Sequence, residues 1–483
     1  MNFQQPLKIL SDSISIMRRV KIIASIGPRT ESEEMMKKLE EAGMNIARVN
    51  MSHGNHAWHS MVMKRVKRIS EQAKFPIGLM LDTQGPEIRT SAKTEFGLKK
   101  GDLFKIAVSS ACDIQEGEKH TFIDYQNLTN KVKKHDTIMI DDGLIALEVL
   151  KVEPYHITCR VLNKGKLEKR KSVNIPGIRT DIPSITKKDI EDVKLGVQHG
   201  IDYVAQSFVR KKEDIRQMRA LLAKLKSNAM VIAKIEDQEG VDNMDEVIEE
   251  ADGVMVARGD LGVQIPLEEI PIVQKQMVDK CIVIGKPVII ATHLLESMIE
   301  KPRPTRAEVT DVANAVFEKA DCIMLSGETT KGEYPVECVK TMHKIAKNVQ
   351  KKLKFEMPGN GLKIGDVKEA ITLGACINAE NLDAKAIIVF SKTGKLLSLV
   401  TKRRPNIDIF AFTDNEEVRK KLMIYWSAFP FRIKFEDNFE VMVNNAIKTL
   451  KDRSLVVKDD RVLVVSDVDK RKDVDILEIR KID

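Results

Sequence analysis

The sequence predicts an α/β fold: a (β/α)8 TIM barrel with an inserted β-barrel lid domain and a C-terminal open α/β domain. Three observations lead to this prediction. Eight short apolar segments recur along the chain, and most are followed by a stretch of helical period, which is the repeat that closes such a barrel. A long stretch within this series has the pattern of β-hairpins, and strand and helix patterns alternate again near the C-terminus.

The eight segments are rich in Ile, Val, Leu and Met and are short enough for buried parallel strands. They are residues 21–27, 45–52, 77–83, 203–208, 230–236, 253–259, 287–293 and 322–328. A TIM barrel carries its chemistry at the carboxyl ends of its strands, and these segments end in polar or charged residues. We therefore expect the following residues to meet at the barrel mouth: Arg48, Asn50, Ser52, Asp82, Thr83, Lys234, Glu236, Arg258, Asp260, Thr292 and Ser326.

The inserted stretch covers residues 87–182, between the third and fourth segments. Residues 136–150 place an Asp-Asp-Gly turn between two apolar runs, which indicates a hairpin. An insertion at this point leaves the barrel from its mouth, so we expect it to cover the active site as a lid. The most basic run, residues 164–171, is interpreted as a solvated hairpin arm.

The C-terminal region follows a predicted long helix from Pro335 to about residue 354 and a Pro-Gly-rich linker at residues 358–361. Its predicted strands are residues 386–391, 407–413, 429–434 and 462–468, and its predicted helices are residues 366–381, 416–423 and 439–450. The expected domains are an N-terminal extension (1–18), the barrel (19–86 and 183–356), the lid (87–182) and the C-terminal α/β domain (362–483).

Composition limits the function classes. With 483 residues and 43% hydrophobic content, the chain can form two or three domains. Its 79 basic and 71 acidic residues are interspersed, and the basic run at 164–171 contains no aromatic residue, so small anionic substrates are favoured over nucleic acid. Six cysteines without a CxxC pair indicate reduced thiols and a cytoplasmic location. No membrane partner is expected, because no run approaches the roughly 18 apolar residues of a membrane helix.

A lysine and two carboxylates form the first candidate site. Lys234 and Glu236 lie two residues apart on one predicted strand, so both side chains face the barrel mouth. Asp260 follows the neighbouring predicted strand. Two carboxylates with room for water and substrate oxygens match the needs of Mg²⁺ or Mn²⁺. A structural ion pair of Lys234 with Glu236 or Asp260 is an equally open interpretation at this point.

Oxygen-bearing side chains form the second candidate site. Arg48, Asn50 and Ser52 alternate with apolar residues and must share a face, which we expect to be the mouth. Together with Asp82 and Thr83, the amide, hydroxyl and carboxylate oxygens could hold K⁺ or Na⁺. Ordinary hydrogen bonding around a Gly-Pro turn is the alternative, and spacing alone favours it.

The familiar nucleotide motifs are absent: the sequence has no GxxxxGK[ST] loop and no GxGxxG after a strand. The segment FSKTGK follows a predicted strand and precedes a helix, so it could cradle a phosphate or could simply be a capped turn. The residues concerned are Ser391, Lys392, Thr393, Gly394 and Lys395. His53, His56 and His59 recur every third residue, but their surroundings do not support a zinc site.

Several motifs, taken together, resemble the pyruvate kinase family. They occur in the family's order from about Arg19 to the C-terminus: ARVNMSHG, LDTQGPEIR, IDDGLIAL, AKIEDQEGV, MVARGDLGV, ATHLLESM, KPRPTRAEVTDVANAV and CIMLSGETTKGEYP. The resemblance implies the barrel, the lid and a regulatory C-terminal domain. It also implies transfer of a phosphoryl group from phosphoenolpyruvate to ADP, giving pyruvate and ATP in the last step of glycolysis.

The resemblance further implies residue roles. Arg48 and Lys234 would hold the phosphoryl group, and Glu236 and Asp260 would bind Mg²⁺ (or Mn²⁺). Thr292 would lie above the enolate carbon, and Ser326 would end a proton relay. The substrate site would consist of Arg48, Lys234, Ala257, Arg258, Gly259, Asp260 and Thr292. The K⁺ ligands would be Asn50, Ser52, Asp82 and Thr83. The nucleotide contacts would be Pro28, Arg48, His53, Trp58, Arg89 and Lys188.

Regulation and assembly are also implied by the resemblance. Glu87 occupies the place where a glutamate accompanies K⁺ dependence in the family, and Asp141 matches a lid residue that faces the cleft. A phosphorylated effector is expected at residues 391–395, although Leu396 stands where the family usually has a hydroxyl. A homotetramer is expected. Two alternatives stay open: another metal-dependent barrel enzyme that acts on enolates, and a catalytically silent regulatory or RNA-binding relative.

Overall fold

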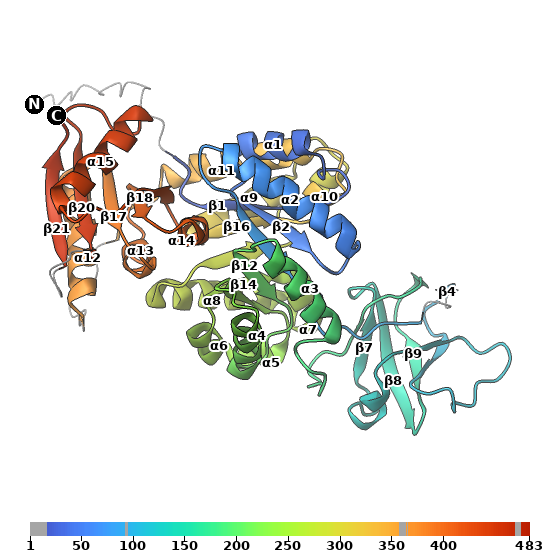
Figure 1. Ribbon diagram of the computed structural model, residues 1–483. Helices are drawn as coiled ribbons and strands as arrows, with labels where there is room; N and C mark the ends of the chain where they lie inside the picture. Colours follow the sequence, from blue (N-terminus) through green and yellow to red (C-terminus); the bar gives the residue numbers. More distant parts are fainter. Residues whose placement is uncertain (1–16, 92–94, 357–363, 365, 469–474) are drawn as a thin grey trace, which may run out of the picture.

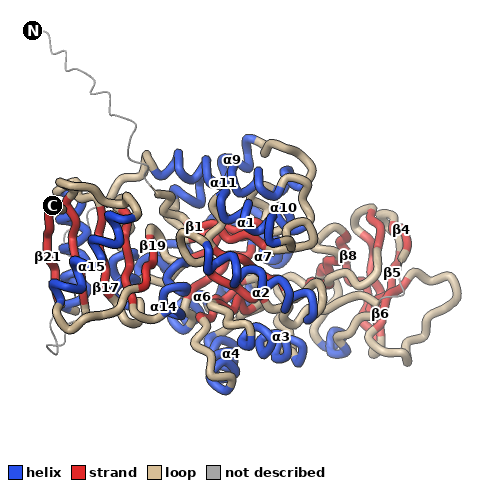
Figure 2. Tube along the Cα trace, turned by 45° about the horizontal axis from the view of Figure 1, so that its top comes forward, coloured by secondary structure: helices blue, strands red, loops and turns tan. Residues whose placement is uncertain are grey.

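The computed structural model describes residues 17–91, 95–356, 364, 366–468 and 475–483. Its centre is a barrel, and the inserted β domain and the C-terminal domain lie on opposite sides of it, as Figure 1 and Figure 2 both show. The predicted N-terminal extension up to residue 16 and the predicted linker at 358–361 lie outside the described residues. The exact domain boundaries remain predictions.

Eight parallel strands close the barrel in the order β1-β16-β15-β14-β13-β12-β3-β2, which confirms the predicted fold. Each strand ends shortly before its predicted segment does, because the polar residues at the segment ends leave the ladder to form the mouth. The strands are β1 (Lys21–Ser25), β2 (Ile46–Asn50), β3 (Gly78–Asp82), β12 (Tyr203–Gln206), β13 (Met230–Ile235), β14 (Gly253–Ala257), β15 (Val288–Ala291) and β16 (Cys322–Leu325).

Helices surround the barrel and bury their apolar faces against the outer sides of the strands. Two begin with capping boxes, at Thr186 and Thr305, so the sequence fixes where they start. They are α1 (Glu33–Ala42), α2 (His56–Gln72), α3 (Lys187–Gln198), α4 (Lys212–Lys224), α5 (Gln238–Asp242), α6 (Met244–Glu250), α7 (Arg258–Gln264), α8 (Ile270–Ile284), α9 (Arg306–Phe317), α10 (Gly327–Thr330) and α11 (Pro335–Gln350), with 3-10 turns η2 (Leu267–Glu269) and η3 (Glu296–Ile299).

The inserted domain consists of a six-stranded sheet in the order β11-β7-β8-β9-β5-β6 and a two-stranded sheet of β10 and β4, which share one apolar core. The predicted hairpin is confirmed: β7 and β8 pair across a turn in which Asp141, Asp142 and Gly143 all have positive φ. The elements are β4 (Phe96–Leu98), β5 (Leu103–Ala107), β6 (His120–Phe122), η1 (Gln126–Asn130), β7 (Thr137–Ile140), β8 (Ile145–Glu153), β9 (His156–Val161), β10 (Gly165–Leu167) and β11 (Val173–Asn174).

The basic run at 164–171 is only partly the solvated arm that we expected. Its first half forms β10 and pairs with β4, and Leu167 is fully buried in the core of the inserted domain. Lys166 and Lys171 form ion pairs with neighbouring carboxylates. The run therefore serves as a strand whose single apolar residue anchors it.

The C-terminal domain is an open sheet in the order β19-β18-β17-β20-β21 with helices on its faces. The sequence prediction missed β21, the antiparallel edge strand, because it is short, half of its residues are charged and none of them is buried. The elements are α12 (Val367–Asn381), β17 (Ala386–Phe390), α13 (Lys395–Thr401), β18 (Asp408–Thr413), α14 (Glu416–Lys421), η4 (Leu422–Ile424), β19 (Ala428–Arg432), α15 (Phe439–Asp452), β20 (Arg461–Ser466) and β21 (Ile476–Lys481).

A buried ion pair joins the C-terminal domain to the barrel. Arg404 Nη1 lies 3.0 Å from Asp321 Oδ1, and both side chains are almost fully buried. Asp321 also accepts hydrogen bonds from the backbone N–H groups of Trp426 (2.8 Å) and Val288 (3.1 Å). The carboxylate thus links residues of both domains at the amino-terminal end of β16.

We expect Arg404→Met to lower the free energy of unfolding by about 3–5 kcal/mol, because it leaves the Asp321 carboxylate buried without its cation. Arg216→Met is the matched control: Arg216 pairs with Glu250 on the surface, and such pairs contribute about 0–1 kcal/mol. Urea unfolding followed by the fluorescence of the buried Trp426 measures both changes. Equal stability of the two variants would show that the ion pair does not hold the domains together.

Candidate active site

The carboxyl ends of the barrel strands open into a cavity of about 570 Å³. The barrel contributes Arg48, Lys234 and Glu236 to its wall, and the inserted domain contributes Asp141 and Lys171. The inserted domain therefore lies against the mouth, as predicted for a lid. Also in the wall are Asn50, Ser52, His53, Glu87, Arg89, Ser207, Phe208 and Asp260.

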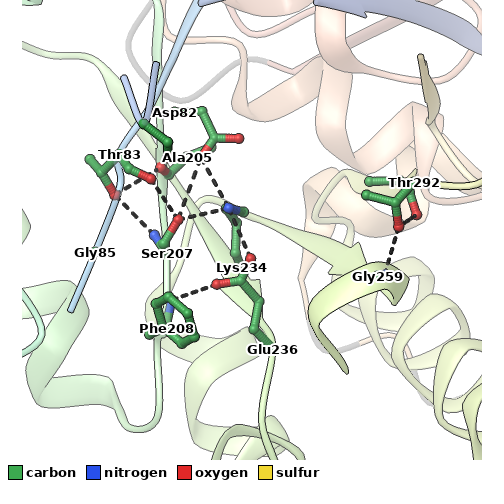
Figure 3. A network of polar contacts seen from close by, with 12 residues as sticks. Asp82, Thr83, Gly85, Ala205, Ser207, Phe208, Lys234, Glu236, Gly259 and Thr292 are labelled. Carbon is green, nitrogen blue, oxygen red and sulfur yellow. Dashed lines mark hydrogen bonds and ion pairs between the residues drawn. The ribbon is translucent and has the colours of Figure 1, made fainter. Parts of the chain in front are cut away.

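A buried carboxylate, that of Asp82, lies between two cations at the base of the cavity. Arg48 Nε lies 2.6 Å from Asp82 Oδ2, and Lys234 Nζ lies 3.0 Å from Asp82 Oδ1. Lys234 also donates to the Ser207 hydroxyl at 2.7 Å and forms an ion pair with Glu236 Oε1 at 2.8 Å (Figure 3). Because Arg48, Asp82 and Lys234 come from three different strands, the barrel itself sets this geometry.

The charges in this network outweigh the effect of burial. Burial alone would raise the pKa of Asp82, but Arg48 and Lys234 hold that pKa below its usual value. Burial opposes the charge on Lys234, yet the carboxylates of Asp82 and Glu236 raise its pKa. Lys234 is therefore a fixed positive charge at the cavity wall.

Glu236 and Asp260 are the two carboxylates considered for a divalent cation. Burial raises the pKa of both groups, and the proximity of Asp260 adds to this effect on Glu236. Glu236 Oε2 accepts the Phe208 N–H at 2.8 Å, and its buried Oε1 lies 2.8 Å from Lys234 Nζ. Both carboxylates line the cavity, so their oxygens suit a hard cation, and water and substrate oxygens can supply the other ligands of Mg²⁺. No cluster of three or more acidic, His or Cys side chains with metal-site geometry occurs in the described ranges.

The four residues considered for a monovalent cation lie at the ends of two adjacent strands. Asn50 and Asp82 are direct partners in the β2–β3 register, and Ser52 and Thr83 follow them. Their hydrogen bonds are local: Asn50 Oδ1 accepts the Ser52 N–H at 3.1 Å, and Thr83 Oγ1 accepts the Ser207 N–H at 3.0 Å. Oxygen donors without sulfur or imidazole suit K⁺.

Arg258 does not face the cavity as a free cation. Its guanidinium forms two bonds with Asp311 (2.7 and 2.8 Å) and donates to the Thr292 carbonyl at 2.7 Å. The sequence placed Arg258 and Asp260 at the end of a strand, but both lie in the first turn of α7, which begins at Arg258. The side chain of Arg258 thus ties the start of α7 to the end of β15 and to α9.

Thr292 and Ser326 follow β15 and β16, and neither belongs to the described wall of the cavity, nor does Ala257. Thr292 has φ 67°, which is unusual for a β-branched residue and is typical of functional sites. Its hydroxyl accepts the Gly259 N–H at 2.8 Å (Figure 3). The Ser326 hydroxyl oxygen is buried and has no hydrogen-bond partner among the described residues.

The residues expected to contact a nucleotide divide into two groups. Arg48, His53 and Arg89 line the cavity. Pro28, Trp58 and Lys188 are not part of its described wall. Trp58 donates its indole N–H to Glu31, and Arg89 donates to the Glu87 carboxylate at 2.7 Å.

The expected effector loop has the geometry of a capped turn. The Ser391 hydroxyl accepts the Gly394 N–H at 3.1 Å, and Thr393 Oγ1 accepts the Lys395 N–H at 3.4 Å. Gly394 has φ 88°, and a side chain there would collide with Leu422. Both hydroxyls therefore already serve the loop itself, while Lys392 and Lys395 are exposed.

Sequence reasoning missed Ser25 and Ser207. The Ser25 hydroxyl accepts from Arg48 at 2.7 Å, and the Ser207 hydroxyl accepts from Lys234 at 2.7 Å. They lie at the ends of the first and fourth barrel segments, the two from which the sequence analysis selected no residue. Both serines could have been predicted, because polar residues at the carboxyl ends of barrel strands are expected at the mouth.

Comparisons with known proteins identify the family. The family profile "Pyruvate kinase, barrel domain" matches residues 17–339, and "Pyruvate kinase, alpha/beta domain" matches residues 369–480. A pyruvate kinase of Staphylococcus aureus (strain MRSA252) is 39% identical over 460 residues, which is 94% of this chain and 78% of that protein. One from Staphylococcus saprophyticus is 40% identical over 461 residues, with the same coverage of both chains.

A solved structure gives the same result. The crystal structure of a pyruvate kinase from Cryptosporidium parvum superposes with a TM-score of 0.89 at 34% sequence identity. The match covers 96% of each chain, so it includes the barrel, the inserted domain and the C-terminal domain.

Proposed function

Because the chain belongs to the pyruvate kinase family, we propose that its cavity transfers the phosphoryl group of phosphoenolpyruvate to ADP and yields pyruvate and ATP. The enzyme is a phosphotransferase of glycolysis. The observation that carries the proposed site is the buried network in which Asp82 holds Arg48 and Lys234 side by side. Two fixed cations at the base of the cavity suit the charge of a phosphoryl group in transfer.

In this proposal Arg48 and Lys234 contact the phosphoryl oxygens. An oxygen of the ADP β-phosphate attacks phosphorus, the bond from phosphorus to the enol oxygen breaks, and Lys234 offsets the charge as it shifts. Glu236 and Asp260 hold Mg²⁺ or Mn²⁺, which when bound neutralises negative charge on the substrate oxygens. Asn50, Ser52, Asp82 and Thr83 hold K⁺.

The other end of the substrate would lie near the start of α7. The substrate carboxylate lies beside the main chain of Ala257, Arg258 and Gly259 and is not held by the Arg258 side chain, which is already bound to Asp311. Loss of the phosphoryl group leaves an enolate, which takes up one proton at its methylene carbon. Thr292 lies on this side of the site, and Ser326, whose hydroxyl has no hydrogen-bond partner among the described residues, would end the water-linked relay that delivers this proton.

The nucleotide is proposed to bind between the barrel and the lid, near Pro28, His53, Trp58, Arg89 and Lys188. A phosphorylated effector is proposed at residues 391–395, where two exposed lysines support it. Exposed apolar side chains on α8 and α9, among them Ile272, Val283 and Phe317, support a homotetramer. Six unpaired cysteines support a cytoplasmic location. None of the described helices has the length and apolar character of a membrane span.

Neither alternative raised from the sequence is favoured. An aldolase-like barrel does not need the inserted domain that lies against the cavity, and a silent relative does not need Lys234, Glu236 and Asp260 together in its wall.

We expect Lys234→Met to lower kcat by about 100- to 1,000-fold, because it removes a preorganised charge from the phosphoryl site. A coupled assay of pyruvate formation from phosphoenolpyruvate and ADP with Mg²⁺ measures the effect. Lys212→Met, which removes a surface lysine paired with Glu246, is the control and should keep normal activity. Full activity of Lys234→Met would contradict the assignment, and an inactive wild type would contradict the proposed reaction.

We expect the wild type to be activated by K⁺ and to lose at least about tenfold in rate when tetramethylammonium replaces it, which corresponds to about 1.4 kcal/mol. Glu87 lines the cavity, where its carboxylate accepts from Arg89 and Gln84. Glu87→Lys places an ammonium group there and should make the rate less dependent on K⁺. Equal turnover of the wild type in both buffers would rule out the cation site.

We expect Ser207→Ala to lower kcat by about tenfold, since a hydrogen bond to a charged group contributes about 1.5 kcal/mol. Ser60→Ala is the matched control, because the Ser60 hydroxyl bonds His199 on the outer face of the barrel. In a Lys234→Met background the Ser207 substitution should have no further effect on kcat. A full additional loss there would show that Ser207 acts independently of Lys234.

A further inference from the structure

Asp192 on α3 is buried and charged, yet it is not in the described wall of the cavity. Each of its carboxylate oxygens has a cationic or polar partner: Oδ1 lies 2.6 Å from His56 Nε2, and Oδ2 lies 2.7 Å from Lys188 Nζ. These partners come from two places, the start of α2 and the first turn of α3. A buried carboxylate with both oxygens engaged fixes its neighbours in space.

Lys188 connects Asp192 to the main chain beside the proposed K⁺ ligands. Its ammonium group donates to the Met51 carbonyl at 2.6 Å while it pairs with Asp192. Met51 is the central residue of the turn formed by residues 50–52, hereafter the cation turn. On the barrel side, the Met51 N–H donates to the Asp82 carbonyl at 2.9 Å. The main chain of Met51 is therefore held from two sides.

His56 holds the chain that follows the cation turn. It is the first residue of α2, directly after the N-cap Asn55, whose side chain accepts the Trp58 N–H at 2.9 Å. Between the turn and the helix lies Gly54, with φ 81°. The His56–Asp192 contact thus fixes the start of α2 on the far side of a flexible residue type.

The first turn of α3 also reaches the second strand end that carries proposed ligands. Asp189 Oδ1 accepts the Gly85 N–H at 3.1 Å, two residues after Thr83. Asp189 is itself fixed in the capping box with Thr186. One short stretch of helix, which follows the return of the chain from the inserted domain, therefore holds the loops after both β2 and β3.

We propose that Asp192 is a positioning residue for the cation turn: it holds Lys188 against the Met51 carbonyl and thereby sets the distance between Asn50, Ser52 and the end of β3. The functional consequence of this inference rests on the proposed K⁺ site. The contacts that position the turn do not depend on a bound cation. An asparagine at this position loses the charge that keeps Lys188 in place. The turn then has one anchor in place of two.

Hydrogen–deuterium exchange of the full-length enzyme tests the hold directly. We expect Asp192→Asn to speed exchange in the peptide that spans residues 50–55, and Lys188→Met to do the same. Lys188 is about half exposed, with a side-chain exposure of 49%, so its variant folds even if Asp192→Asn does not. Asp202→Asn is the matched control, because Asp202 is also a buried aspartate, lies at the opposite end of the barrel and accepts the Leu79 N–H.

Measurement of the rate as a function of K⁺ concentration tests the functional consequence. We expect a rise of roughly tenfold in the K⁺ concentration at half-saturation for Asp192→Asn, as for loss of a group that orients metal ligands, with little change in half-saturating phosphoenolpyruvate. The Asp192→Asn substitution should add nothing to this rise in a Lys188→Met background.

The outcomes separate the two proposals. Unchanged exchange at residues 50–55 in both variants would overturn the role of Asp192, whatever the K⁺ result. If exchange is faster in the two variants but the rate of the wild type does not depend on K⁺, Asp192 positions the turn and the proposed K⁺ site is wrong. Equal acceleration by Asp202→Asn would show a general loss of stability and would also overturn the inference.

Discussion

The site depends on the buried carboxylate of Asp82. An isolated charge in this position would be costly to desolvate, but Arg48 and Lys234 each occupy one of its oxygens. Each cation would in turn be unstable there without the carboxylate. The three charges therefore stabilise one another, and the arrangement leaves two positive side chains fixed at the cavity wall before any substrate binds. In many enzymes, preorganised charge of this kind makes the largest single contribution to the rate enhancement.

The parallel barrel turns a sequence pattern into this cluster. A period of two sends Arg48 and Asn50 on β2, and Lys234 and Glu236 around the end of β13, toward the same opening. The register then matches Asn50 with Asp82 across adjacent strands. Because all eight strands run in the same direction, each adds its last residues to one face, and the insertion after β3 lies against that face.

These regularities explain what the sequence could predict. Strand order, the inserted domain and the convergence of Arg48, Asp82 and Lys234 follow from periodicity and barrel geometry. Contacts between distant helices cannot be predicted in this way. Nothing in the sequence indicates that Arg258 pairs with Asp311, and because of this pair the Arg258 side chain holds α7 to α9 and is not available to a ligand. Ser207 was missed because a serine after a strand has no distinctive signal by itself. The edge strand β21 was missed because three of its six residues are charged and none of the six is buried.

The two ends of the barrel have opposite physical roles, and the C-terminal domain packs against the end away from the mouth. At the mouth, burial of carboxylates works against stability, as the raised pKa values of Glu236 and Asp260 indicate. At the opposite end, Met423 and Ile424 of the C-terminal domain join the apolar side chains that fill the barrel, and the Tyr203 hydroxyl donates to main-chain carbonyls of α14. Burial of apolar surface at this end favours folding. The same strands can therefore present unfavourable charge at one end because they are closed by apolar packing at the other.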